Sequence, residues 1–529
     1  MTASGRRRAG ILLPLFACPS RASWGIGEIG DIAPIARWLS SAGQRVLQLL
    51  PLNEMAPGHQ SPYTAISAMA IDPIFISVAA VPDFQALGGE TAMSAADRGE
   101  LAAVRAAPHI QHKPVRRLKQ SALSAAFDGF MHTEWTRDSE RARMFRSFIS
   151  EQAWWVEPYA LFRAIHAHRG ERPWTEWPVE LQRLEPIAID SARRELSRQV
   201  RFYQYLQWLA ATQWRDARRA AGQTSPPVEL FGDLPFMVDG DSADVWARQR
   251  EFRFDASTGA PPDAFSATGQ DWGVPLYDWD AVAVDDFRWL RERARRNADL
   301  YDGYRIDHLV GFYRTYGHPR GGGPGFFTPA DESAQLALGE RVLAVFRSAG
   351  AEIVAEDLGT VPDAVRASLA RLGVPGFRVL RWEREWHTDG QPFRDPAAYP
   401  PVSVATSGTH DTEPLVLWWE TASDDERHKV AAVPTIQRLA SGANLLDGNV
   451  AAVRDVLLEA LYASGSDLVL APMQDVFGWR DRINVPATIA DSNWTFRLPW
   501  FADELDDVPE ARERRDRLRA WSEKHGRHG

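Results

Sequence analysis

Short apolar runs alternate with amphipathic segments of helical period along most of the chain. Residues 11–16 form an apolar run that predicts a buried strand. Asp31 and Gly43 are typical of the start and the end of a helix, and the apolar residues between them share one helical face. A second apolar run at residues 46–50, which ends at Pro51, predicts the next strand. Because parallel strands need a crossover connection, this order of elements predicts a parallel sheet.

The same unit recurs in the second half of the chain, where helical segments precede short apolar runs. The helical segments are residues 285–297, 339–348 and 361–372, and the apolar runs are residues 304–306, 353–355, 377–380 and 402–406. This alternation predicts a (β/α)8 barrel that carries insertions. A doubly wound sheet is the alternative, but no glycine-rich phosphate-binding pattern follows any predicted strand.

Residues 84–220 differ from the predicted barrel units. They are rich in Ala, Arg, Gln and Trp, and their pattern predicts mostly helix. We interpret this stretch as a helical insertion into a single barrel domain that spans residues 1–529. The glycine-rich segment 321–325 lacks the Lys-Ser/Thr pair of a phosphate-binding loop, which favours a flexible surface loop.

The charge of the chain narrows the choice of partner. Lys and Arg number 60 against 70 Asp and Glu, which gives a formal net charge of −10. This balance argues against nucleic acid or an anionic membrane surface and favours a neutral substrate. The 21 Trp residues fit a sugar substrate, because indole rings stack on the flat faces of sugars, although core packing explains many of them equally well.

The first residues require a choice between an export signal and an internal strand. Three arginines at residues 6–8 precede a short apolar stretch that ends near Cys18. The stretch is short and contains Pro14, which favours an internal strand. Cys18 is the only cysteine, so an intrachain disulfide and a cysteine-based metal site are excluded. We therefore expect a cytoplasmic protein.

Three acidic residues occupy equivalent places in the strand pattern. Asp307 and Glu356 each follow directly after a predicted strand, and Asp411 comes shortly after the strand at residues 402–406. Loops after the strands of a (β/α)8 barrel converge on one rim, so we expect the three carboxyl groups to face one another. A helix cap or an ion pair is the alternative role for any one of them. Three acids in equivalent places favour a shared catalytic role.

Cleavage of a glycosidic bond uses such a set. One carboxyl group delivers a proton to the leaving oxygen, and a second carboxylate meets the oxocarbenium-like carbon. In a retaining enzyme the second carboxylate forms a covalent glycosyl intermediate. Arg305 lies two residues before Asp307 and so shares its face of the strand. A cation there favours an ionised nucleophile.

Three short motifs that contain these acids resemble those of a known enzyme family. Residues 304–308 (Tyr-Arg-Ile-Asp-His) are similar to the nucleophile motif of the amylomaltases, also called 4-α-glucanotransferases, in the α-amylase clan. Residues 355–359 resemble the acid/base motif of that family, and residues 408–411 resemble its third-carboxylate motif. Other segments match the family in the same order along the chain: residues 60–63, 232–235, 241–246, 261–263, 265–270, 272–273, 474–475 and 484–486.

The resemblance implies a (β/α)8 fold with helical insertions and assigns a role to each acid. Asp307 would be the nucleophile, Glu356 the acid/base and Asp411 the stabiliser of the transition state. The residues around the sugar would be Tyr63, Asp233, Arg305 and His410, with Gln270 and Trp272 in a cleft-covering loop region at residues 240–285. The family generally needs no metal for catalysis, and no further ligand at metal spacing accompanies His308 and His410. We expect no cofactor.

The resemblance also implies the reaction: transfer of a segment of an α-1,4-glucan donor to a glucose or glucan acceptor. Departures from the family pattern fall away from the three acids, at Leu47, Asp72, Ala264, Val274 and Ala487. Ala264 replaces a large residue in the loop around Phe265 that overhangs the cleft, so we predict mainly transfer with some hydrolysis.

Three alternative functions remain. The chain could be an α-glucan hydrolase with the same site, or a glucan-binding paralogue without catalysis, which the intact acids argue against. A barrel enzyme of other chemistry, such as an isomerase or aldolase, lacks support because no Schiff-base lysine lies beside the acids.

Overall fold

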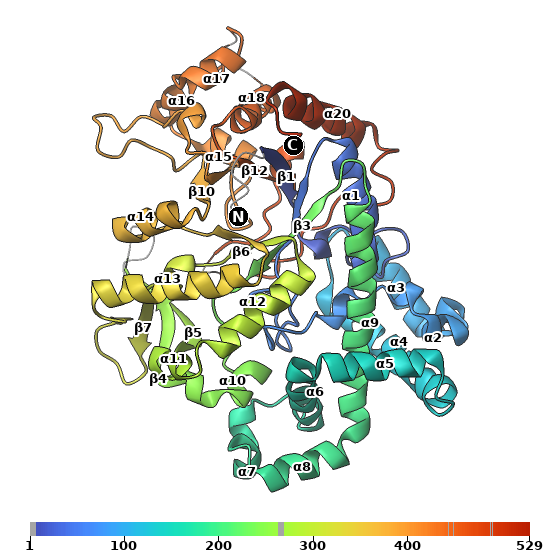
Figure 1. The fold of residues 1–529 in the computed structure, drawn as a ribbon. Helices are drawn as coiled ribbons and strands as arrows, with labels where there is room; N and C mark the ends of the chain where they lie inside the picture. Colours follow the sequence, from blue (N-terminus) through green and yellow to red (C-terminus); the bar gives the residue numbers. More distant parts are fainter. Residues whose placement is uncertain are drawn as a thin grey trace.

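Eight parallel strands close into a barrel at the centre of the molecule (Figure 1). The computed structural model describes residues 7–262, 269–442, 444–447, 449–486, 488 and 490–528. Neighbouring barrel strands follow one another along the chain, and the first pairs with the last. The predicted (β/α)8 barrel is therefore confirmed. Its strands are β1 (Arg8–Leu12), β2 (Val46–Gln48), β3 (Glu229–Leu234), β6 (Gly303–Ile306), β9 (Glu352–Ala355), β10 (Gly376–Val379), β11 (Ser403–Thr406) and β12 (Leu468–Pro472).

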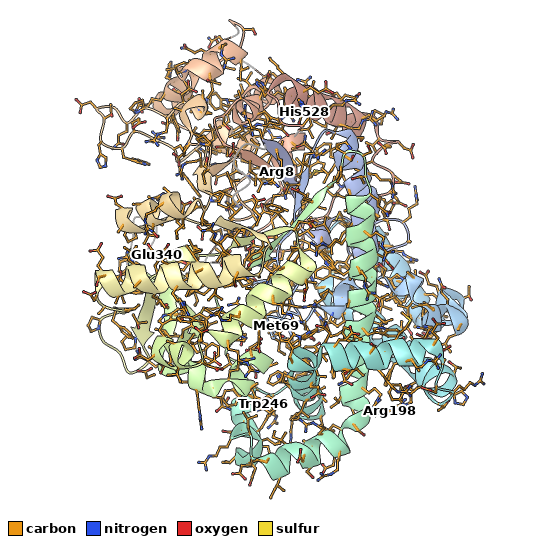
Figure 2. The ribbon with its side chains drawn as sticks, in the orientation of Figure 1. Arg8, Met69, Arg198, Trp246, Glu340 and His528 are labelled. Atoms are coloured by element: carbon orange, nitrogen blue, oxygen red, sulfur yellow. The ribbon has the colours of Figure 1, made fainter. Side chains whose placement is uncertain are left out.

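The structure corrects the first predicted strand. β1 begins at Arg8 and ends at Leu12, and residues 15–17 form a short 3-10 helix instead of extending the strand. Pro14 lies between them and has no N–H to donate to a neighbouring strand. The charged side chain of Arg8 is stable in this buried strand because it has two carboxylate partners. Its Nη2 donates to Glu352 at 2.8 Å, and its Nη1 pairs with Glu229. Arg8 and His528 form an antiparallel bridge and lie close together in Figure 2.

Amphipathic helices surround the barrel and bury their apolar faces against it. In α12 the buried residues include Trp289, Leu290 and Ala294, at the spacing of one helical face. α13 begins earlier than the pattern predicted because Asp331 caps it, accepting the N–H of Ala334. The outer helices are α1 (Ile32–Ser41), α12 (Arg288–Leu300), α13 (Glu332–Ser348), α14 (Asp363–Leu372), α15 (Leu415–Thr421), α16 (Asp424–Ala431), α17 (Pro434–Leu439), α18 (Val450–Tyr462), α19 (Met473–Phe477) and α20 (Pro509–Lys524).

A group of helices is inserted between β2 and β3. The longest, α9, runs beside α1 and reaches from the barrel to α8, while α2–α5 lie on one side of it (Figure 1). Ion pairs fix this group to the loop after β2; Arg116 on α4, for example, pairs with the buried Asp72 at 2.9 Å. The helices are α2 (Pro82–Ala86), α3 (Ala95–Ala106), α4 (His112–Phe130), α5 (Glu140–Glu151), α6 (Ala153–His168), α7 (Val179–Gln182), α8 (Pro186–Glu195) and α9 (Ser197–Gly222).

The stretch at residues 240–285 was predicted as a loop region, but its described part is largely structured. It contains α10 (Ala243–Ala247), β4 (Phe252–Ala260), β5 (Gln270–Tyr277) and α11 (Trp279–Val284). With β7 (Thr315–Pro319) and β8 (Phe326–Thr328) these strands form an antiparallel sheet in the order β5-β4-β7-β8. Two register shifts between β4 and β5 disturb the period-two pattern, which is why the sequence did not predict this sheet. Ala264 and Phe265 lie outside the described residues.

The glycine-rich segment 321–325 lies in the connection between β7 and β8, as a surface loop. Among the described residues, none of the helices combines the length and the apolar character needed to cross a bilayer.

Candidate active site

The site residues come from the carboxyl ends of the barrel strands. Asp233 lies near the end of β3, and its Cα partner in the neighbouring strand β6 is Arg305. Asp307 directly follows β6, and Glu356 directly follows β9. Asp411 lies in the loop after β11. Because parallel strands end at the same rim, this arrangement places all these residues on one end of the barrel.

Arg305 connects two carboxylates on adjacent strands. Its Nη1 donates to both oxygens of Asp233 at 2.7 and 2.8 Å, and its Nη2 lies 2.8 Å from Oδ1 of Asp307. The hydroxyl of Tyr63 donates to Asp233 Oδ2 at 2.8 Å. Burial by itself would lower the pKa of Arg305, but the charges of Asp233 and Asp307 raise it well above its usual value. Burial raises the pKa of Asp233 to about 6 in spite of the Arg305 charge.

Glu356 is bound by main-chain donors. The N–H of His308 donates to Oε2 at 2.7 Å, and the N–H of Leu358 donates to Oε1 at 3.1 Å. Burial raises the pKa of Glu356 to about 7; the Arg305 charge opposes this rise and the Asp307 charge adds to it. At neutral pH both protonation states of Glu356 are therefore populated, as a general acid/base requires.

Asp411 has a strongly polar environment. Asn484 Nδ2 donates to its Oδ1 at 2.6 Å, and His410 Nε2 lies 3.3 Å from its Oδ2. Arg482 Nη2 donates to the main-chain oxygen of Asp411 at 2.8 Å. Burial would raise the pKa of Asp411, but His410 and Asn484 hold it well below its usual value. A permanently charged carboxylate at this point can stabilise a developing positive charge.

Aromatic rings line the site on two sides. The rings of Tyr63 and His410 stack with their centroids 5.1 Å apart. On the other side, Trp272 of β5 contacts the ring of His308 edge-on at 4.9 Å. Trp272 is 38% exposed, and its Nε1 donates to Gln270 Oε1 at 3.3 Å. Burial lowers the pKa of His308 to about 4, so its ring is neutral at neutral pH.

The structure brings together all nine residues that the sequence singled out. Trp272 donates to Gln270 and contacts the ring of His308, whose N–H donates to Glu356. Arg305 pairs with both Asp307 and Asp233, and Tyr63 donates to Asp233. The ring of Tyr63 stacks on that of His410, which faces Asp411. Sequence reasoning did not assign a role to Asn484, Arg482 or Trp494, which all contact this network. Asn484 lies in a motif that the sequence analysis recognised, so the signal was present; Trp494 carried none. In the part of the chain that is described, no group of three or more His, Cys, Asp or Glu is arranged to hold a metal ion.

Comparison with known proteins identifies the family. A family model described as 4-alpha-glucanotransferase matches residues 13–503. The chain belongs to this family. Among curated 4-alpha-glucanotransferases, it is 34% identical to one from Synechocystis sp., over 95% of each chain. It is 32% identical to one from Chlamydia pneumoniae, over 94% of this chain and 92% of the relative.

Solved structures of amylomaltases share the fold. The amylomaltase from Streptococcus agalactiae in complex with acarbose is similar at a TM-score of 0.82 and 26% identity, over 99% of this chain and 100% of that one. The amylomaltase from Corynebacterium glutamicum shares the fold at a TM-score of 0.79, over 97% of this chain and 75% of that one. The barrel with its inserted helices is thus the architecture of the 4-alpha-glucanotransferase family.

Proposed function

We propose that this member of the 4-alpha-glucanotransferase family transfers a segment of an α-1,4-glucan to a glucose or glucan acceptor, with Asp307 as the nucleophile. One observation carries the proposal: Glu356 and Asp307 are held on adjacent strand ends, one by the N–H of His308 and the other by Arg305. A carboxyl group with a pKa of about 7 beside a carboxylate paired with a guanidinium is the pair that a retaining mechanism needs.

In the first step Asp307 attacks the anomeric carbon of the donor. The bond from this carbon to the glycosidic oxygen breaks, and Glu356 donates its proton to that oxygen, so the leaving chain departs as an alcohol. Asp411 stabilises the oxocarbenium-like transition state, because His410 and Asn484 hold its pKa well below the usual value and its carboxylate stays charged. The product is a glycosyl ester of Asp307.

In the second step an acceptor hydroxyl attacks the same carbon. Glu356, now a carboxylate, takes the proton of the hydroxyl, and the ester bond to Asp307 breaks. Two displacements at one carbon retain its configuration. Tyr63, Asp233, Arg305 and His410 are proposed to bind the sugar at the cleavage point. Arg305 pairs with Asp307 and connects it to Asp233 and Tyr63, and His410 faces Asp411.

Whether a sugar or water completes the reaction depends on the acceptor side of the site. Trp272 offers a partly exposed indole beside His308, and a sugar ring can stack on such a surface. Acceptor binding raises the effective concentration of the sugar hydroxyl over that of water. We therefore propose that transfer exceeds hydrolysis and that Gln270 and Trp272 help to hold the acceptor.

Product analysis from maltotriose alone tests the function. Transfer gives glucose together with a ladder of longer chains, whereas a hydrolase gives only glucose and maltose. Binding of maltotriose without any product would instead support a glucan-binding protein without catalysis. Either of the last two results contradicts the proposal. A cytoplasmic location is part of the proposal, in keeping with the single cysteine, and cell fractionation tests it.

A further inference from the structure

Trp494 has an unusual backbone for a large aromatic residue. Its φ is +63°, in the left-handed region that residues other than glycine rarely adopt. The side chain is 8% exposed, so the ring is fixed by packing. The main chain is held on both sides: the N–H donates to the oxygen of Ile483 at 2.8 Å, and the oxygen accepts His112 Nε2 at 2.9 Å. Strain of this kind persists only where the surroundings enforce it, and it is concentrated at functional sites.

The indole lies behind two rings of the proposed sugar site. Its centroid is 5.9 Å from that of Tyr63 and 5.8 Å from that of His410. Tyr63 donates to Asp233, which pairs with the same Arg305 that faces Asp307. His410 faces Asp411. Trp494 thus contacts one ring from the nucleophile half of the site and one ring from the half that contains the third carboxylate.

The helical insertion fixes the position of Trp494. His112 is the first residue of α4, and its bond to the Trp494 oxygen is continued by a bond from the Ile110 N–H to the Thr495 oxygen at 2.9 Å. Arg497 Nη1 donates to the oxygen of Ala107 at 2.6 Å. Residues 494–497 are therefore tied to residues 107–112, and the insertion supports the back of the site.

We propose that Trp494 is a positioning residue of the glucan-transfer reaction, which keeps the rings of Tyr63 and His410 in register with the reacting carbon. This inference rests on the function proposed above. Trp494 itself is not assigned a contact with the substrate: it acts through the two rings. Loss of the indole removes the packing behind both rings and lets them shift, and small displacements of this kind reduce the rate of the chemical step more than substrate binding.

Two substitutions at position 494 separate the effect of the indole ring from that of the left-handed backbone. Trp494→Asn removes the indole but suits a left-handed backbone, since Asn tolerates this region. We expect kcat on maltotriose to fall by about 10²-fold, with KM changed by less than about threefold. Trp494→Phe keeps an aromatic ring and restores kcat to within about tenfold of the unsubstituted protein.

Phe287→Asn is the matched control. Phe287 also has a left-handed backbone, with φ +56°, and is 7% exposed, but it precedes α12 on the outside of the barrel. Its replacement by Asn removes a buried aromatic ring at the same kind of backbone. We expect a lower Tm and an unchanged kcat per folded molecule in this variant, which shows that loss of such a ring alone does not slow the reaction.

His112→Ala gives a second test that leaves the indole in place. It removes the hydrogen bond to the Trp494 oxygen, and we expect kcat to fall at a nearly constant KM. This variant decides the question if Trp494→Asn does not fold. A further check combines Trp494→Asn with Tyr63→Leu. The activity of the double variant falls by less than the product of the two single losses, because one of the two rings that Trp494 supports is already absent.

The outcomes distinguish this inference from the proposed function. The proposed function is overturned if the unsubstituted protein forms no chains longer than maltotriose. The positioning role alone is overturned if the unsubstituted protein is active and both Trp494→Asn and His112→Ala keep the full kcat per folded molecule. A fall in kcat that Phe287→Asn shares to the same extent also overturns it, since the effect then reflects general loosening of the fold.

Discussion

Asn484 donates a hydrogen bond from Nδ2 to Oδ1 of Asp411 across 2.6 Å. The two residues come from different loops of the barrel rim, one after β11 and the other after α19. The contact is reinforced by the main-chain N–H of Asn484, which donates to the oxygen of His410 at 3.2 Å. The loop that contains Asn484 therefore sets the orientation of the third carboxylate.

Asn484→Ala tests this orientation. We expect kcat on maltotriose to fall by about 10²-fold, because Asp411 loses a donor that holds its carboxylate in place. Steady-state kinetics on maltotriose measure the effect. Asn449→Ala, which removes the N-cap of the outer helix α18, is the control and lowers only the Tm. Equal kcat values in the two variants would contradict the role of Asn484.

Asp307→Asn tests the nucleophile. We expect turnover to fall by at least about 10⁴-fold, since an amide does not form the glycosyl ester. The fold is retained, because Arg305 keeps its two bonds to Asp233. Initial rates and the thermal unfolding curve together check both statements. Undiminished activity would remove Asp307 from the mechanism.

Glu356→Gln tests the acid/base. The rate on maltotriose falls strongly, whereas the formation of the glycosyl intermediate from α-maltosyl fluoride falls much less, since fluoride departs without a proton. In the unsubstituted protein kcat/KM on maltotriose decreases as the pH rises through about 7, where Glu356 loses its proton. Rates on the two substrates across this pH range provide the measurement. Equal losses on both substrates would contradict the acid role.

The same residue predicts a change in stability with pH. The pKa of Glu356 is raised from 4.5 to about 7 by folding, so the folded state binds its proton more tightly than the unfolded state does. The stability from this group is complete below pH 4.5 and is lost as the pH rises through about 7. Gln does not titrate, so Glu356→Gln gains stability relative to the unsubstituted protein as the pH rises from 4.5 through about 7. We expect the gain to reach about 3 kcal/mol in urea unfolding experiments. A difference in stability between Glu356→Gln and the unsubstituted protein that does not change with pH would argue against the raised pKa of Glu356.

Trp272→Ala tests the acceptor side. The substitution removes the exposed indole beside His308, and we expect a larger share of hydrolysis among the products of maltotriose. The ratio of free reducing sugar to transferred sugar gives the result. Phe254→Ala is the control: it removes another exposed ring, on β4 of the same antiparallel sheet, and leaves this ratio unchanged. An equal ratio in Trp272→Ala and the unsubstituted protein would remove Trp272 from the acceptor side.

The sequence by itself determined the barrel and the positions of Asp307 and Glu356 next to its strands. Both results depend on local signals: apolar runs of strand length, helices of regular period, and an acid directly after a strand. Arg305 could be placed beside Asp307 for the same reason, because residues two apart share a face of a strand.

Only the tertiary structure decided which distant groups complete the site. Asn484 and Trp494 reach Asp411, Tyr63 and His410 from irregular segments whose course depends on packing. The antiparallel sheet that presents Trp272 was hidden by register shifts between β4 and β5. The left-handed backbone of Trp494 is held by a bond to Ile483, earlier in the same segment, and by a bond to His112, which is far from it along the chain. No pattern of residues around position 494 encodes the contact with His112.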